Sequence, residues 1–438
     1  MKMADVPGMA MVVIKNGKVA WLGNFGVKKA GTSDSINVES IFEAASLSKP
    51  VFAYGVLKLV DQGKINLDTP LNKYLGNNYE VGDDQRINQI TARRVLSHSS
   101  GFPNWRPQDS KTLPINFTPG EKFSYSGEGF VYLAKVVEKL TGLSLDEFVK
   151  KEVFIPLQMK TSSYVSQPWY DKNKVYRHNF IGDPSIRFLD VTANAAASLH
   201  TTSSDYARFV IALLNGDGLK KQTWKEMLSP QIKVDPDKYP GLAWGLGIGL
   251  EQENNNTVFW HWGDQGDSKA FLYARVQQKD AVLYFAPARN GLSFAKDLCT
   301  DIMGDASYAS LKWLDYRSYN ARNSTARILL DNSMTNGAES ALKTYLDKRS
   351  NKADTLTEYQ VNWVGYKLLQ ASKAKDAIII LRQNTEDYPK SGNTWDSLAE
   401  AYMKDGDKAN AILYYKKSLE VEPENTNAAE QLKKLESK

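Results

Sequence analysis

Strand-forming sequence lies at both ends of about the first 300 residues, and helical, loop-rich sequence lies between them. The chain opens with an apolar run over residues 9–14, the hairpin signal Asn16-Gly17 and a returning strand over 19–22. Strand patterns separated by short polar turns return over 242–288. Strands so far apart share one sheet only when the helices between them, over about 64–235, form an insertion. We therefore expect a mixed α/β (α+β) fold with an antiparallel sheet flanked by helices.

Beyond about residue 310 the strand patterns end and the sequence is purely helical. A segment that starts at Gly392 resembles one 34-residue tetratricopeptide unit, and the preceding 34 residues keep the same phase. The matched positions are Trp395, Leu398, Ala399, Tyr402, Ala411, Tyr415 and Pro423, and, one unit earlier, Val361, Val364, Gly365, Leu368, Ala377, Leu381 and Pro389. A looser helix pair before them and a final helix after them would complete a short solenoid. We therefore predict two domains, 1–310 and 311–438, the second an all-α tetratricopeptide-like solenoid, with an unrelated helical bundle as the alternative.

Composition excludes several classes of function. With 42% hydrophobic and 24% charged residues, the chain has the composition of a folded globular protein. Its net charge of +5 is spread along the length without a basic block, so no nucleic-acid partner is expected, and no apolar run is long enough for a membrane span. Cys299 is the single cysteine and the four histidines are scattered, so we expect no disulfide, no metal and no cofactor.

The motif S-x-x-K is the first candidate for catalytic chemistry. It occurs four times, at Ser46, Ser293, Ser340 and Ser372, so the spacing alone selects none of them. Ser46 differs because it follows an extended stretch and opens a buried helix, whose first turn must include Pro50. The unpaired N–H groups and positive dipole end at such a place stabilise developing negative charge.

Lys49 lies one helical turn from Ser46 and on the same face. Burial lowers the pKa of a lysine until the amine can accept the proton of a serine hydroxyl, and the serine then becomes a nucleophile. The alternative interpretation is that Ser46 caps the helix while Lys49 points into solvent.

Two later segments resemble those of the class C β-lactamase-related serine hydrolases, within the serine β-lactamase and penicillin-binding-protein family. In "FTPGEKFSYSGEGF", Tyr125 falls on the tyrosine of a Tyr-x-Asn element, and "VFWHWGDQGDSKAF" resembles the strand that carries Lys-Thr-Gly or His-x-Gly, giving His261-Trp262-Gly263. Other segments match in family order, among them "VPGMAMVVIKNGKV", "INLDTPLNKYL" and "ITARRVLSHSSGFP". The resemblance covers about residues 5–305 and implies a β-lactamase/transpeptidase-like fold.

The resemblance also implies roles for individual residues. Ser46 would attack the acyl carbon, while Lys49 and the Tyr125 phenol or phenolate would move the proton. Backbone N–H groups of Ser46 and Asp264 would form the oxyanion hole. His261 would lie on an edge strand beside the acyl group, where it would orient the substrate and tune Tyr125. Its ring would give a substrate carboxylate a weak, titratable positive charge.

Substrate binding is expected from Gly127, Trp262, Gly263 and Trp105. The family's Tyr-x-Asn is Tyr-Ser-Gly here, so Gly127 lacks the amide that binds an acylamino carbonyl, which makes β-lactamase activity less expected. The tryptophans Trp105, Trp244, Trp260 and Trp262 form either core or the wall of an acyl pocket. His98 and His200 are expected to be structural.

The sequence therefore predicts a serine hydrolase that forms an acyl-enzyme through Ser46 and acts on small esters or D-amino-acid amides and peptides. A β-lactamase or D-alanyl-D-alanine carboxypeptidase is the alternative among enzymes. From another class, a non-catalytic peptide-binding scaffold would recruit a protein partner through the helical repeats. No signal peptide is present in the chain, which begins almost at the first strand. That start fits a processed, periplasmic or otherwise exported protein, and a cytoplasmic location is the alternative.

Overall fold

The computed structural model describes the chain outside residues 108–109, 186–191, 254–255, 317–324, 350–354 and 437–438. Contacts among the described residues divide the chain into two compact units, Met1–Arg317 and Ser318–Lys438. The sequence boundary at 310 would cut through helix α9 (Ala309–Leu314), which belongs to the first unit.

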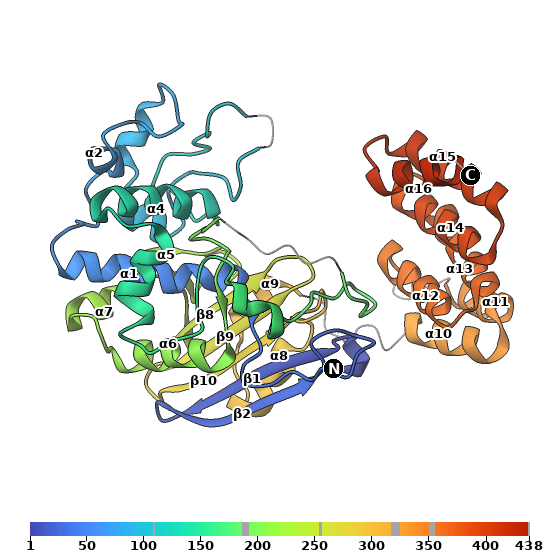
Figure 1. The fold of residues 1–438 in the computed structure, drawn as a ribbon, viewed down its shortest axis with the longest axis horizontal. Coiled ribbons are helices and arrows are strands. Elements are labelled where there is room, and N and C mark those ends of the chain that lie inside the picture. Colours follow the sequence, from blue (N-terminus) through green and yellow to red (C-terminus); the bar gives the residue numbers. More distant parts are fainter. Residues whose placement is uncertain (108–109, 186–191, 254–255, 317–324, 350–354, 437–438) are drawn as a thin grey trace. The chain divides into compact units, whose positions relative to one another are not determined.

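An eight-stranded sheet forms the centre of the first unit and draws its strands from both ends of that unit (Figure 1). Its order is β2-β1-β10-β9-β8-β7-β6-β5, and each neighbouring pair is antiparallel. The strands are β1 (Gly8–Lys15), β2 (Lys18–Gly26), β5 (Ile232–Lys233), β6 (Leu242–Trp244), β7 (Gly249–Glu253), β8 (Asn256–Asp264), β9 (Lys269–Arg275) and β10 (Asp280–Ala286). The predicted mixed α/β fold is confirmed.

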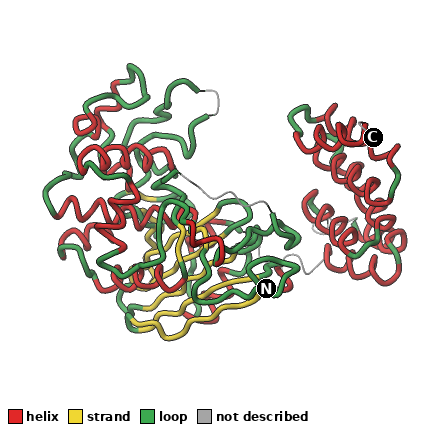
Figure 2. The backbone as a smooth tube through the Cα atoms, in the orientation of Figure 1, coloured by secondary structure: helices red, strands yellow, loops and turns green. Residues whose placement is uncertain are grey.

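Helices occupy the insertion between β2 and β5. Figure 2 shows the red helices of the first unit beside the yellow strands of its sheet. Among them α6 packs on β1 and β10, and α1 is buried along nearly its whole length because apolar residues surround its axis. The helices of the insertion are α1 (Ser48–Asp61), α2 (Leu71–Leu75), α3 (Ala92–Leu96), α4 (Gly127–Thr141), α5 (Leu145–Val149), α6 (Ser203–Asn215) and α7 (Lys221–Met227), and α8 (Ala295–Met303) follows β10. A second, two-stranded sheet pairs β3 (Phe42–Glu43), just before α1, with β4 (His200–Thr201), just before α6, and His200 is buried there.

The second unit is helical throughout its described residues. It contains α10 (Thr325–Asn336), α11 (Ala338–Lys348), α12 (Glu358–Gln370), α13 (Ala374–Asp387), α14 (Gly392–Asp405), α15 (Lys408–Val421) and α16 (Thr426–Glu436). The helix pairs α12–α13 and α14–α15 coincide with the two predicted repeat units. Gly365 permits the close crossing of α12 and α13, because a Cβ there would lie 2.5 Å from the Leu381 side chain. The all-helical fold is confirmed, and its tetratricopeptide character stays a prediction.

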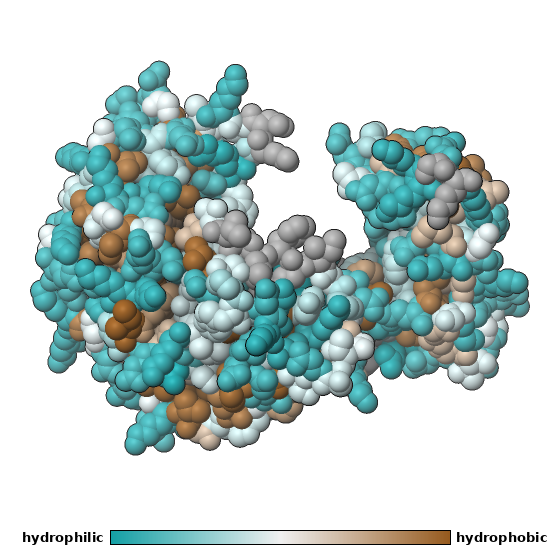
Figure 3. Space-filling view, in the orientation of Figure 1, coloured by the Kyte–Doolittle hydropathy of each residue, from teal (hydrophilic) through white to brown (hydrophobic). Residues whose placement is uncertain are grey.

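Hydrophilic side chains cover most of the face shown in Figure 3, with apolar ones scattered between them. Within the part of the chain that the structure describes, no helix is long and apolar enough to cross a membrane.

Candidate active site

Ser46 lies in a tight turn, η2 (Ala45–Leu47), directly before α1. Its neighbours on both sides are buried, whereas Ser46 itself is half-buried and reachable. Ala45 has a φ of +49°, a left-handed conformation that alanine rarely adopts and that persists only when the surroundings enforce it. Gly263 of β8 is part of those surroundings, because a Cβ there would lie 2.5 Å from the Ala44 carbonyl oxygen. The glycine of the His-Trp-Gly triplet is thus required by packing against the serine turn.

Three hydroxyl groups fasten this turn from behind. Tyr206 Oη donates to the Leu47 carbonyl at 2.9 Å, and Tyr164 Oη donates to the Ser48 carbonyl at 2.6 Å. Ser48 Oγ donates to the Ala45 carbonyl at 2.5 Å. Satisfied backbone groups on the buried side keep the Ser46 side chain in one position, as a preorganised nucleophile requires.

Lys49 is completely buried beside Ser46. Its Nζ lies 3.1 Å from Ser46 Oγ and 2.8 Å from the Ala196 carbonyl oxygen. Burial lowers the pKa of Lys49 to about 7, so a large fraction of the amine is uncharged near neutral pH. An uncharged amine that donates one N–H to Ala196 keeps its lone pair for the Ser46 proton. The alternative with Lys49 in solvent is wrong, and so is Ser46 as the helix cap, because Leu47 holds that position.

Tyr125 lies across from Lys49, whose Nζ is 4.7 Å from the centre of the tyrosine ring. Burial raises the pKa of Tyr125 well above its usual value, and the nearby Ser46 hydroxyl offsets only part of that rise. The Tyr125 hydroxyl therefore stays a neutral phenol near pH 7. It is buried and, among the described residues, has no hydrogen bond of normal distance and angle, so its proton is available to a substrate.

His98 holds Tyr125 in place, a role that agrees with the structural assignment made from sequence. The centres of the two rings are 4.2 Å apart, and Ser126 N donates to His98 Nδ1 at 3.0 Å. His98 is buried, which lowers its pKa well below the usual value and keeps the ring uncharged. The next residues begin α4, where Ser126 Oγ accepts from Gly129 N at 3.0 Å as the helix cap.

His261 is fully buried on β8, which pairs with β7 on one side and β9 on the other, so the predicted edge-strand position is wrong. Its Nδ1 is 2.8 Å from the Trp262 carbonyl oxygen, while its Nε2 has no partner among the described residues. Burial, with a smaller contribution from the charge of Lys49, lowers the pKa of His261 to about 3. Burial therefore favours the neutral imidazole near pH 7, which disagrees with the titratable positive charge expected at this position.

The four tryptophans divide between core and site. Trp244 and Trp260 are fully buried and belong to the core, whereas Trp262 is half-buried with its ring centre 4.8 Å from that of Tyr125. Trp105 is 47% exposed and covers Gly127 so closely that a Cβ there would lie 2.8 Å from the indole. The indole thus fills the space in which the asparagine side chain of a Tyr-x-Asn element would begin. Lys49 Nζ is 6.0 Å from the same ring.

Asp264 ends β8, directly after Gly263, and its carboxylate contacts two residues that sequence reasoning missed. Lys269 Nζ, from the facing position on β9, and Tyr316 Oη both donate to it. Of these two contacts, the sequence could have indicated only the one with Lys269. Asp264 and Lys269 flank the turn between β8 and β9, and an antiparallel hairpin places such residues opposite each other. The oxyanion role of the Ser46 and Asp264 amides stays a prediction.

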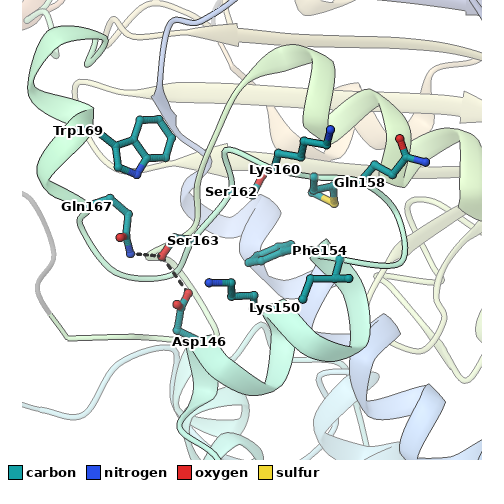
Figure 4. Close-up of a pocket in the computed structure, with 11 residues that line it drawn as sticks. Asp146, Lys150, Phe154, Gln158, Lys160, Ser162, Ser163, Gln167 and Trp169 are labelled. Carbon is teal, nitrogen blue, oxygen red and sulfur yellow. Dashed lines mark hydrogen bonds between the residues drawn. The ribbon is translucent and has the colours of Figure 1, made fainter.

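A separate cavity of about 340 Å³ lies between α5 and the loop that follows η4 (Lys150–Phe154), and Figure 4 shows its lining. None of the predicted catalytic residues lines it. Its Ser163 Oγ donates to Asp146 Oδ1 at 2.9 Å and accepts from Gln167 Nε2 at 3.1 Å. These polar groups satisfy one another, so the cavity contains no activated nucleophile.

A family model described as Beta-lactamase matches residues 1–299. The chain belongs to the beta-lactamase family. Two relatives are penicillin-binding protein 4 of Amycolatopsis lactamdurans, 25% identical over 68% of this chain and 86% of the relative, and the D-alanyl-D-alanine-carboxypeptidase/endopeptidase AmpH of Escherichia coli (strain K12), 23% identical over 68% and 85%. In this beta-lactamase family member, α9 and the helical unit follow the matched region.

Solved structures show the same fold for the first unit. A class C beta-lactamase superposes with a TM-score of 0.60 at 19% identity, over 69% of this chain and 91% of that one. A D-stereospecific amidohydrolase from Streptomyces sp. superposes with a TM-score of 0.57 at 22% identity. EstCE1, a hydrolase with promiscuous acyltransferase activity, superposes with a TM-score of 0.60 at 18% identity. Each of the last two covers 69% of this chain and 95% of the other. At these identities the likeness establishes the β-lactamase fold.

Proposed function

We propose that this beta-lactamase family member is a serine hydrolase that forms an acyl-enzyme through Ser46. The observation that carries the proposal is the buried Lys49 amine, 3.1 Å from a half-buried serine hydroxyl and with a pKa of about 7. As Ser46 Oγ attacks the acyl carbon, its proton moves to the Lys49 lone pair, and the carbonyl electrons move onto oxygen opposite backbone N–H groups. The leaving group departs with a proton supplied by Lys49 and the Tyr125 phenol. A water molecule then attacks the acyl carbon of the acyl-enzyme, with its proton taken up in the same way, and Ser46 leaves as the free hydroxyl.

Small esters or D-amino-acid amides and peptides are the proposed substrates. Trp105 stands where an acylamino group would meet an asparagine amide, so the site favours an apolar acyl group over a hydrogen-bonding one. The neutral His261 removes a positive charge that would attract a substrate carboxylate. The printed names of two structural neighbours, a D-stereospecific amidohydrolase and a hydrolase with acyltransferase activity, lie within this range of chemistry.

A β-lactamase or D-alanyl-D-alanine carboxypeptidase is the second candidate, favoured by the name of the Escherichia coli relative. If the protein hydrolyses a chromogenic cephalosporin as fast as it hydrolyses short acyl esters, the β-lactamase or carboxypeptidase assignment would replace the esterase assignment. A D-amino-acid peptide substrate would fit an exported location, whereas hydrolysis of small esters needs no such location.

A non-catalytic scaffold is less consistent with a half-buried Ser46 beside a buried lysine whose pKa is about 7 and a neutral Tyr125 phenol. A fluorophosphonate probe distinguishes the two classes, because it reacts only with an activated serine. We expect one label per chain, and peptide mapping should place it on Ser46. A folded chain that takes no label would support the scaffold.

Trp105→Ala should change acyl selectivity. Removing the indole takes away apolar contact for a large acyl group, so kcat/KM for an aromatic or long-chain acyl ester should fall about tenfold while that for an acetyl ester changes little. The measurement is the ratio of kcat/KM values on matched p-nitrophenyl esters. Trp169→Ala is the control, since Trp169 is similarly exposed at 44% and lines the separate cavity. Equal losses on both esters, or none, would remove Trp105 from substrate binding.

The helical unit is proposed as a separate tetratricopeptide-like domain whose groove binds a protein segment. A chain ended after residue 317 should keep its own thermal transition and hydrolyse esters within about twofold of the full chain, because the described contacts of the first unit end there. Calorimetry and an ester assay check this. Aggregation, or loss of the transition, would show that the helices belong to the same folding unit.

A further inference from the structure

The segment that follows the family domain is fastened to the strands of the catalytic sheet. The Glu251 carboxylate on β7 accepts from Ser307 Oγ and Ala309 N at 2.7 Å, and from Ser310 N at 3.1 Å and Ser310 Oγ at 2.7 Å. Glu251 is buried, so these bonds are shielded from water. Tyr239 Oη adds a bond to the Lys312 carbonyl at 3.1 Å. Residues 307–312 are thus a fixed part of the first unit.

The end of the same segment reaches the proposed active site. The ring centre of Trp313 lies 5.8 Å from that of Trp262, which in turn packs on Tyr125. Tyr316 lies three residues further on, and its Oη donates to Asp264 Oδ2. The tyrosine therefore contacts the residue whose backbone N–H is proposed to stabilise the oxyanion.

Both oxygens of the Asp264 carboxylate are occupied by donors. Oδ1 accepts from Lys269 Nζ and from Gly266 N, the latter at 3.0 Å, and Oδ2 accepts from Tyr316. The Lys269 side chain is only 5% exposed, and its Nζ lies 5.6 Å from the centre of the Tyr316 ring. The carboxylate is therefore held in one rotamer by a buried cation, a backbone amide and a phenol.

The donors around the Asp264 carboxylate matter for the proposed reaction. A carboxylate on the residue that supplies an oxyanion-hole amide opposes the negative charge that develops on the substrate oxygen, unless donors neutralise it or hold it away. Lys269 supplies the opposite charge, and Tyr316 fixes the second oxygen. Fixing the side chain also fixes the backbone at the end of β8, where the Asp264 N–H must point at the oxyanion.

We propose that Tyr316, acting with Lys269 on Asp264, is a positioning residue of this active site, which thus extends beyond the family domain into the segment leading to the helical unit. The inference rests on the proposed serine hydrolase function. It assigns Tyr316 an effect on transition-state stabilisation, with no direct contact to substrate.

Tyr316→Phe in the full chain tests this, with Tyr239→Phe as the matched control because it removes one phenol bond from the same segment without contacting Asp264. For Tyr316→Phe we expect kcat on a p-nitrophenyl ester to fall about tenfold with KM within about twofold. Affinity for an arylboronic acid, which forms a tetrahedral adduct with the serine, should fall in parallel. The control should match the wild type in both measurements, and both variants should share one unfolding temperature.

A double-mutant cycle with Asp264→Asn identifies the route of the effect. If Tyr316 acts through the carboxylate, the loss caused by Tyr316→Phe shrinks to about twofold or less in the Asp264→Asn background. Wild-type kcat and boronate affinity in Tyr316→Phe would overturn the inference while leaving the hydrolase proposal intact. A wild type that neither hydrolyses esters nor binds the boronate would instead overturn the hydrolase proposal itself.

Discussion

Ser46→Ala should lower ester hydrolysis by about 10⁴-fold or more, because Ser46 has the one hydroxyl among the described residues that is hydrogen-bonded to the Lys49 amine. The substitution should leave the free energy of unfolding nearly unchanged. Ser46 is half-buried and the turn is held by the hydroxyls of Tyr164, Tyr206 and Ser48, none of which bonds to Ser46. Steady-state assays and thermal unfolding measure the two quantities.

Ser340→Ala is the control for that result. Ser340 begins another S-x-x-K motif, lies exposed on α11 and should behave as the wild type in both assays. A comparable residual rate in Ser46→Ala, or an equal loss in Ser340→Ala, would show that the S-x-x-K motif at Ser46 does not carry the reaction.

Lys49→Arg should lower kcat/KM by about 10³-fold although it keeps a positive charge near Ser46. The guanidinium does not lose its proton in proteins, so it cannot act as the base. The same reasoning fixes the pH dependence. The pKa of Lys49 is about 7, and the active form is the uncharged amine, so kcat/KM should rise as pH increases through about 7 and fall as pH decreases below it.

The pH–rate profile and the variant together separate a base from a mere charge. Lys58→Arg is the control, because Lys58 lies on the same helix and donates to the Glu152 carbonyl at 2.7 Å. It should keep the wild-type rate and profile. A full rate in Lys49→Arg, or a rate that does not change between pH 6 and 8 in the wild type, would assign the proton transfer to another group.

Much of the fold could be predicted because its signals are local. The Asn16-Gly17 turn, the strand alternation over 242–288 and the phase of the helical repeats are each set within a few dozen residues. The end of the first unit could not be placed, because α9 joins it through the Glu251 carboxylate, more than 50 residues earlier in the chain. The periodic patterns that predict helices and strands contain no information about such a long-range contact.

The site was predictable to the extent that its motifs follow one another in order. The structure brings Ser46, Lys49 and Tyr125 together, and Gly263 packs on the serine turn. The charge of His261 was misjudged because a sequence does not show burial, which determines the pKa there. Tyr316 could not be anticipated at all, since its bond to Asp264 depends on where α9 is anchored.

Mass spectrometry of the intact protein, quenched during turnover of a slow aromatic ester, tests the central claim most directly. The account predicts a mass increase of one acyl group, mapped to the peptide that contains Ser46 and absent in Ser46→Ala. Hydrolysis without any acylated protein, or an acyl group on a peptide other than that of Ser46, would contradict it.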